Sequence, residues 1–162
     1  MFEFDKYRKI LEEIEVLRKK TKIIAVSKNH PRHDVIEAIK AGVRIFGENR
    51  VQEAKTKFKD LKTEYPDLEI HLTGSLQTNK VKDAVNLFDV FHTLDREKLA
   101  RELAKQLNIS TKRLFIQVNT GKEKNKSGIY PEHLEQFINY CKQDLSLNIV
   151  GLMCIPPVND NP

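Results

Sequence analysis

Six short apolar runs, each of strand length, recur along the chain and alternate with segments of helical periodicity. The runs are KIIAVS at 22–27, VRIFG at 43–47, LEIHLTG at 68–74, FDVFHTL at 88–94, RLFIQVN at 113–119 and LNIVGLMCI at 147–155. Strands that are almost continuously apolar are buried on both faces, which is typical of parallel sheets covered by helices. The sequence therefore predicts an α/β fold built from repeated strand-then-helix units.

The segments between these runs have the spacing of amphipathic helices. After the first run, Val35, Ile36 and Ile39 share one helical face, and Gly42 marks the expected end of that helix. A further helix is predicted before the first run, because apolar residues occupy positions 7, 10, 11, 14 and 17. The sixth run is followed by PPVNDNP, which has the composition of a loop.

Two architectures are compatible with this pattern, an open doubly wound sheet and a closed barrel of eight strand-and-helix units. Six strands are a common number for an open sheet and are two fewer than a barrel contains. The apolar pattern alone therefore slightly favours the open sheet. In both architectures ligands bind at the carboxyl ends of the strands, so the residues after each run are the candidate functional residues.

Length and composition limit the class of protein. The 162 residues suit a single domain, 1–162, and with 40% apolar and 31% charged residues we expect a folded globular chain. No apolar run reaches the roughly 18 residues of a membrane-spanning helix, and the first residues lack the apolar core of a signal peptide, so a cytoplasmic location is expected. Cys141 and Cys154 have no metal-like spacing and are expected to be reduced, partly buried thiols with a packing role.

The net charge of +5 favours anionic partners such as phosphorylated small molecules. The basic residues are interspersed with acidic ones, as in EAKTKFKDLKTE, and this pattern is typical of solvated helix faces. No combination of aromatic and basic residues of the RNA-binding type occurs, so nucleic acid is not an expected partner.

Lys28 follows the first apolar run directly, in AVSK. A lysine at a strand end commonly extends its ammonium group into solvent, and on the pattern alone this is the simpler interpretation. The alternative is that the partly desolvated amine is a nucleophile that forms a Schiff base with an aldehyde. Pyridoxal phosphate is the natural aldehyde, because its phosphate suits the helix N-termini expected at the same edge of the sheet.

Three other features of the sequence give weaker indications of function than Lys28. His30 and His33 lack further metal ligands, so no zinc or other metal site is predicted. The stretch NTGKEKNKSG lacks the glycine and the Ser or Thr that a P-loop needs. His71 lies inside an apolar run, where a hydrogen-bonded core histidine and a ring packed against a ligand are equally good interpretations.

Five motifs in order, AVSK, FGENRVQEAKTKF, IHLTGSLQTNK, LFIQVNTGKEKNKSG and GLMCIPP, resemble the pyridoxal-phosphate-binding proteins of the YggS/PROSC type, from about Lys22 to Pro157. This resemblance implies a TIM-type (β/α) barrel like the alanine racemase N-terminal domain, and pyridoxal 5'-phosphate held on Lys28 as an internal aldimine. It also implies that Asn49 and His71 surround the cofactor ring and that Met153 forms a wall of the pocket.

The same resemblance gives Lys126 a secondary position near the pocket mouth. Members of the family continue beyond the GLM strand into a Ser-x-Asp motif and an Arg-Ile-Gly motif, which hold the cofactor phosphate and contact its ring nitrogen. Compared with them, the present chain is expected to contain about six of the eight strand-and-helix units. Family members are monomers, but an incomplete barrel leaves strand edges unpaired, so association or low stability is expected here.

The resemblance implies a pyridoxal phosphate carrier and buffer that supplies the cofactor to pyridoxal-phosphate-dependent apo-enzymes, with no established catalytic turnover and no catalytic residues assigned. One alternative is an amino-acid racemase-like enzyme that uses the same lysine. The other is a truncated product with weak or no cofactor binding. Racemases on this barrel use a second domain to place a tyrosine base opposite the cofactor, and the length of the present sequence leaves no room for that domain.

Overall fold

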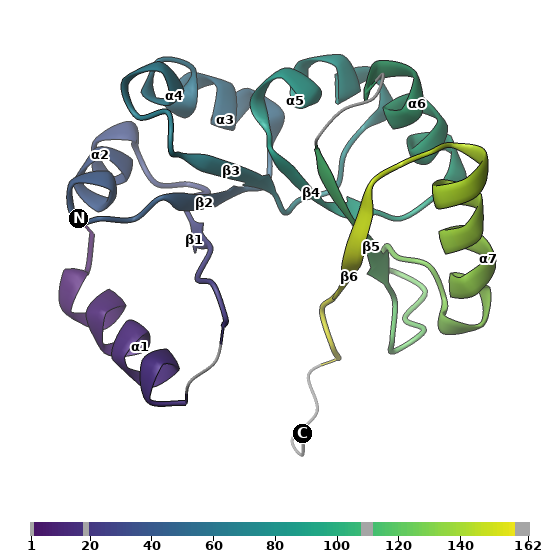
Figure 1. Ribbon diagram of the computed structural model, residues 1–162, viewed down its shortest axis with the longest axis horizontal. Helices are drawn as coiled ribbons and strands as arrows, with labels where there is room; N and C mark the ends of the chain where they lie inside the picture. The colour runs from purple at the N-terminus through teal and green to yellow at the C-terminus, as the bar shows by residue number, and fades with distance from the viewer. Residues whose placement is uncertain (1, 18–19, 108–111, 158–162) are drawn as a thin grey trace.

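The computed structural model describes residues 2–17, 20–107 and 112–157. These residues form one parallel sheet of six strands in the order β1-β2-β3-β4-β5-β6 (Figure 1). The strands are β1 (Ala25–Val26), β2 (Ile45–Glu48), β3 (Glu69–Leu72), β4 (Val90–Leu94), β5 (Arg113–Val118) and β6 (Ile149–Cys154). The predicted α/β class is therefore confirmed.

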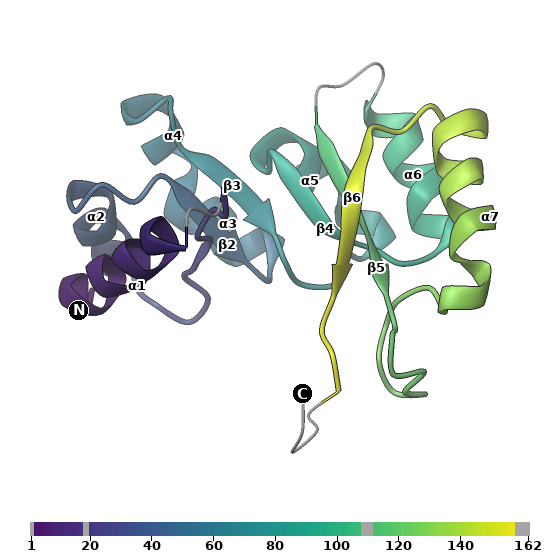
Figure 2. The same ribbon diagram turned by 60° about the horizontal axis from the view of Figure 1, so that its bottom comes forward.

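One helix precedes β1, and the others connect each strand to the next. The helices are α1 (Phe4–Val16), α2 (Arg32–Lys40), α3 (Val51–Phe58), α4 (Leu61–Glu64), α5 (Val81–Leu87), α6 (Glu97–Leu107) and α7 (Leu134–Asn139). Short 3-10 turns at Thr78–Lys80 and Pro131–His133 precede α5 and α7, and a π-helical turn at Tyr140–Asp144 extends α7. The helices between successive strands lie on one face of the curved sheet and leave the other face concave (Figures 1 and 2).

The strand order decides between the two architectures. In a doubly wound sheet the order reverses at the middle and helices cover both faces. Here each strand pairs with its sequence neighbours and the connecting helices lie on one side, as in a (β/α) barrel. The slight preference of the apolar pattern for an open doubly wound sheet was wrong, and the described residues form six strand-and-helix units of an incomplete (β/α) barrel.

The hydrophobic core lies between the sheet and the layer of helices. Phe46 of β2 packs against Phe58 of α3 with 5.4 Å between the ring centroids, and both side chains are fully buried. Ile70 and Leu72 of β3 point to the same face and are equally inaccessible. Burying side chains of this size contributes roughly 1.5–3 kcal/mol each, so this layer holds the strands, and their carboxyl ends, in place.

The first predicted helix and the first predicted strand are both present, but each differs from the sequence prediction. Helix α1 lies at the β1 edge, apart from the other helices (Figures 1 and 2), and Tyr7 packs against the core while Ile10 and Leu11 stay exposed. Strand β1 has two residues where the apolar run has six, because it is an edge strand that pairs with β2 alone.

The two cysteines differ from each other. Cys141 is fully buried, and burial raises the pKa of its thiol to about 12, so its expected packing role fits the structure. Cys154 is exposed on β6, and the expectation that it is partly buried was wrong. The reason is that no described helix covers the outer side of β6, on which Val150 and Leu152 are also exposed.

Candidate functional site

Because the six strands are parallel, their carboxyl ends lie along one edge of the sheet, and four residues predicted for the site come from this edge or its concave face. Lys28 lies in the turn that follows β1, with its side chain exposed. It makes no hydrogen bond or ion pair with any residue that the structure describes. The amine is therefore accessible and has no intramolecular competitor.

Asn49 follows β2 and joins the ends of two strands. Its Oδ1 accepts a hydrogen bond of 2.9 Å from Oγ1 of Thr73, the residue after β3. Gly74 lies so close to this residue that a Cβ atom there would be 2.3 Å from the Asn49 carbonyl oxygen. The Gly74 carbonyl in turn accepts a 2.8 Å hydrogen bond from Oγ1 of Thr93. These contacts fix the ends of β2, β3 and β4 relative to one another.

His71 lies on the concave face and is only 7% exposed at its side chain. Its Nε2 is 2.6 Å from Oε1 of Glu69, and its Nδ1 is 2.8 Å from Nε2 of His92 on β4. Glu69 also forms an ion pair with Arg113 of β5. Both ring nitrogens of His71 are thus occupied by protein partners, which is the arrangement of a hydrogen-bonded histidine, while the edge and face of the ring remain on the concave side.

The ring of His92 stacks between two others. Its centroid lies 4.7 Å from that of Phe115 with an angle of 3° between the planes, and 5.0 Å from that of His71. Burial lowers the pKa of His92 to about 4, and the neighbouring His71 and Arg113 act in the same direction. Burial also lowers the pKa of His71, although the Glu69 carboxylate opposes this shift. Both imidazoles are therefore neutral at physiological pH.

Met153 lies on β6, at the far edge of the sheet from Lys28. Gly151, two residues earlier, packs so tightly on Phe115 that a Cβ atom there would be 2.8 Å from the ring. Alternate residues of a strand share a face, so Met153 also faces the concave side, with Gln117 as its partner in register. Met153 lies across the full width of the sheet from Lys28, and its role as a wall of the pocket stays a prediction.

The loop after β5 carries Lys126 and is organised by Asn119. The Asn119 amide donates to the carbonyl oxygens of Glu123 and Lys126, at 2.9 and 3.2 Å, and its Oδ1 accepts from the Glu123 amide. The Lys126 ammonium pairs with the Glu123 carboxylate at 2.6 Å. Lys126, Gln117 and Ser75 line a cavity of about 200 Å³ at the carboxyl ends of the strands.

A second cavity at the same edge, of about 510 Å³, also contains Ser75. Arg50, which precedes α3, and Lys80, which precedes α5, contribute cationic groups to its lining, together with Asn49. Lys126 adds a third cation in the neighbouring cavity. An aldehyde that carries a phosphate needs an accessible amine and a cationic or amide-lined surface. The residues at this edge provide both, so they fit such a group.

Sequence reasoning missed a cluster that contacts the residues on both sides of Lys28; we call it the Lys57 cluster, and it consists of Ser27, Glu48, Glu53 and Lys57. In the sequence Glu48 is one of the residues that follow the second apolar run, and Lys57 belongs to the stretch EAKTKFKDLKTE, which was assigned to a solvated helix face. The structure buries Lys57 instead, between helix α3 and the end of β1. A signal was present in the sequence, because Lys57 lies on the helical face that also carries the apolar residues Ala54 and Phe58.

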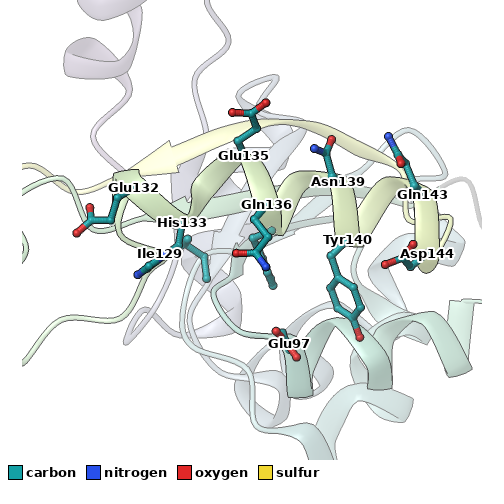
Figure 3. Close-up of a pocket in the computed structure, with 11 residues that line it drawn as sticks. Glu97, Ile129, Glu132, His133, Glu135, Gln136, Asn139, Tyr140, Gln143 and Asp144 are labelled. Atoms are coloured by element: carbon teal, nitrogen blue, oxygen red, sulfur yellow. The ribbon is translucent and has the colours of Figure 1, made fainter.

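A further cavity is remote from these residues. It has a volume of about 800 Å³ and lies between α7 and the start of α6, where Glu97 and Tyr140 face one another (Figure 3). Several of its lining residues are acidic, but none of the residues predicted for the site is among them. Lys28 and the strand ends remain the candidate site, because the chemistry that a bound aldehyde needs lies there and not in this cavity.

The two histidines of the HPRH stretch lie beside the same carboxylate. Nδ1 of His30 is 3.2 Å from Oδ2 of Asp34, and Nε2 of His33 is 3.2 Å from Oδ1. In the described part of the chain no group of three or more His, Cys, Asp or Glu residues is arranged to hold a metal ion. None of the described helices combines the length and the apolar character needed to cross a membrane.

Comparison with known proteins connects this geometry to a family. The family described as alanine racemase, N-terminal domain, matches residues 6–162. Two relatives named pyridoxal phosphate homeostasis protein are 39% identical over 143 residues, in Aquifex aeolicus, and 41% identical over 143 residues, in Vibrio cholerae. These alignments cover 87% and 86% of the chain and 62% and 61% of the relatives, so the chain spans about three fifths of their length.

Solved structures agree with the fold. PipY of Synechococcus elongatus without PLP superposes with a TM-score of 0.77 at 39% identity, covering 91% of this chain and 71% of PipY. The structure of PipY with PLP bound gives a TM-score of 0.74 at 36% identity, covering 93% of this chain and 72% of PipY. An alanine racemase of Clostridium difficile, at 16% identity and a TM-score of 0.62, shares the fold alone. The chain therefore belongs to the alanine racemase N-terminal domain family, in its branch of pyridoxal phosphate homeostasis proteins.

Proposed function

We propose that this chain binds pyridoxal 5'-phosphate covalently through the amine of Lys28 and acts as a carrier and buffer of the cofactor. The observation that supports this most directly is the position of Lys28: it is exposed, without a partner among the described residues, and lies at the strand edge that also carries cationic cavities. The pyridoxal phosphate homeostasis proteins that it resembles, and PipY with PLP bound, support the same assignment.

The bound cofactor would supply an electrophilic carbonyl, and the residues of this chain would hold it. Arg50, Lys80 and Lys126 give the cavities at the strand ends a positive charge that favours a phosphate. The Asn49–Thr73 hydrogen bond keeps the carboxyl ends of β2 and β3 in one conformation. His71 contributes a neutral ring on the concave face and has no nitrogen free for a further hydrogen bond.

We further propose that the chain passes the cofactor to pyridoxal-phosphate-dependent apo-enzymes. An exposed lysine at an open edge allows a second amine to approach and take the aldehyde, whereas a racemase encloses its cofactor between two opposed acid–base groups. The exposure of Lys28 therefore favours the carrier over the racemase-like alternative. Transfer is tested by mixing the loaded chain with an apo-enzyme and following the recovery of that enzyme's activity.

The binding proposal is tested by trapping. The purified chain is mixed with pyridoxal phosphate, reduced with borohydride, and digested for mass spectrometry, alongside Lys28→Ala and the control Lys55→Ala, which removes an exposed lysine of α3. We expect a single modified peptide containing Lys28 in the unmodified chain and in Lys55→Ala, and its loss in Lys28→Ala. Modification spread evenly over many lysines would overturn the proposal.

A further inference from the structure

The ammonium group of Lys57 is almost completely enclosed, with 7% of its side chain exposed. It donates three hydrogen bonds: to the Ser27 carbonyl oxygen at 2.5 Å, to Oε1 of Glu48 at 2.9 Å and to Oε1 of Glu53 at 2.7 Å. A lysine ammonium has three donors, so its hydrogen-bonding capacity is fully used. A charge buried in this way is specified by its partners, because it would be strongly unfavourable without them.

The partners of Lys57 hold the chain on both sides of Lys28. On one side, Ser27 is held by its carbonyl oxygen and by its hydroxyl group, which donates to Oε1 of Glu48 at 2.7 Å. On the other side, the Asn29 amide donates to Oε1 of Glu53 at 2.6 Å. Asn29 has a φ of 64°, a left-handed conformation that asparagine tolerates and that these contacts stabilise.

The charges of the cluster are unequal, with two carboxylates for one ammonium. Oε2 of Glu48 is buried and has no hydrogen-bond partner among the described residues. Arg50 adds a positive charge near Glu53, and the Arg32 guanidinium donates to the Lys57 carbonyl oxygen at 2.6 Å. Lys28 lies between Ser27 and Asn29, which both contact the cluster, so without Lys57 its ammonium would be attracted to the freed carboxylates, and an ion-paired amine is a poor nucleophile.

We propose that Lys57 is a positioning residue for Lys28: by engaging Glu48 and Glu53 and fixing Ser27 and Asn29, it holds the turn and keeps the Lys28 amine free to react. The inference rests on the proposed function for its biological meaning. The physical part, that Lys57 controls the reactivity of Lys28, stands on the contacts of the Lys57 cluster and can be tested without the cofactor.

The test is the rate at which Lys28 is methylated by dilute formaldehyde and cyanoborohydride at fixed neutral pH, measured by peptide mass spectrometry. We expect Lys57→Met to slow this reaction roughly tenfold, the effect of one unpaired charge at short range. Adding Glu53→Gln to Lys57→Met removes one of the freed carboxylates and should restore much of the rate. If the second substitution restores the methylation rate, the slow reaction of Lys57→Met comes from ion pairing of Lys28 with a freed carboxylate. General damage to the fold would not be repaired in this way.

The matched control is Lys62→Met, which removes the partly buried ion pair of Lys62 with Asp89, at 2.6 Å and on a different part of the sheet. This variant should methylate Lys28 at the normal rate. If Lys57→Met does not fold, hydrogen exchange at the Asn29 amide in Glu53→Ala replaces it, and we expect faster exchange there than in Lys62→Met. Unchanged methylation of Lys28 in folded Lys57→Met, or unchanged exchange in Glu53→Ala, overturns the inference.

In a parallel experiment, the same variants are trapped with pyridoxal phosphate and borohydride. If the unmodified chain is methylated at Lys28 but never trapped with pyridoxal phosphate, the proposed function fails, and the effect of Lys57→Met on methylation still decides the inference. If trapping succeeds and Lys57→Met leaves both reactions unchanged, the inference fails and the proposed function stands.

Discussion

Nδ1 of His71 lies 2.8 Å from Nε2 of His92, and this contact joins two strands of the concave face through neutral imidazoles. Because Nε2 of His71 faces the Glu69 carboxylate, it carries the proton, and its Nδ1 must accept from His92. Protonation of His71 disturbs this chain of hydrogen bonds, because a second N–H on His71 would face the N–H of His92.

The free energy of unfolding should therefore decrease as the pH is lowered through the range set by the pKa values of His71 and His92. The folded-state pKa of His92 is about 4 and that of His71 is also lowered, so below about 6.5 the unfolded chain binds protons before the folded chain does. We expect the free energy of unfolding, measured by urea denaturation, to decrease as the pH is lowered from about 6.5 to 4.5, by roughly 1–3 kcal/mol.

The variant His92→Phe tests the assignment, because it keeps an aromatic ring against Phe115 and removes the titrating group. Its unfolding free energy should depend less on pH in that window than that of the unmodified chain. An equal pH dependence in both chains would contradict the role of His92. Carboxylates with lowered pKa, such as Asp89 and Glu69, contribute at the acid end of this window and below it, where the unfolded chain takes up their protons first.

Replacing Gly74 by alanine should disrupt the packing between the carboxyl ends of β2 and β3. A Cβ atom at this position would be 2.3 Å from the Asn49 carbonyl oxygen, and backbone atoms cannot move aside without shifting the end of β2 or β3. We expect Gly74→Ala to lower the free energy of unfolding by about 2 kcal/mol or more, in the range found for overpacked positions. Gly121→Ala is the comparison, because its nearest neighbours are side-chain atoms of Glu123 and Pro157. Similar losses in both variants would show that the close approach at Gly74 is unimportant.

Asp89 should be important for stability although it lies outside the site. Burial alone would raise its pKa, but hydrogen bonds from the Lys62 ammonium and the Ile70 amide hold the pKa below its usual range. Asp89→Asn leaves the Lys62 ammonium partly buried without its charge partner. We expect a loss of about 1–3 kcal/mol in urea denaturation at pH 7. A simultaneous Lys62→Met substitution should recover part of this loss, and its failure to do so would contradict the pairing.

The outer side of β6 should promote self-association. Leu152 is 51% exposed there, and Val150 and Cys154 on the same side of the strand are exposed as well. We expect the chain to sediment as larger species as its concentration rises, and Leu152→Glu to suppress this by placing a charge in the apolar surface. Val16→Glu on α1, at a position 81% exposed, is the comparison and should have little effect. Concentration-independent sedimentation of the unmodified chain would contradict the prediction.

The hydrophobic pattern of the sequence was sufficient to predict the strands and helices of the fold. The alternation of apolar runs and amphipathic segments determined six strands with helices between them, because burial on both faces of a strand and on one face of a helix leaves a periodic trace in the sequence. The same pattern placed Lys28 and Asn49 after strands β1 and β2, where the structure has them. The motifs around these residues also indicated the family.

The arrangement of the strands and the interior of the site depended on tertiary structure. Apolar runs of similar composition can be ordered in more than one way, so the barrel order could not follow from the pattern, which favoured the other architecture. His71 and His92 are 21 residues apart and meet only because β3 and β4 are neighbours in register. Lys57 belongs to a charged helix whose sequence suggests solvent, and the end of β1 and Glu48 bury it. Such contacts depend on which segments pack together, and one residue's neighbours in the sequence do not determine that.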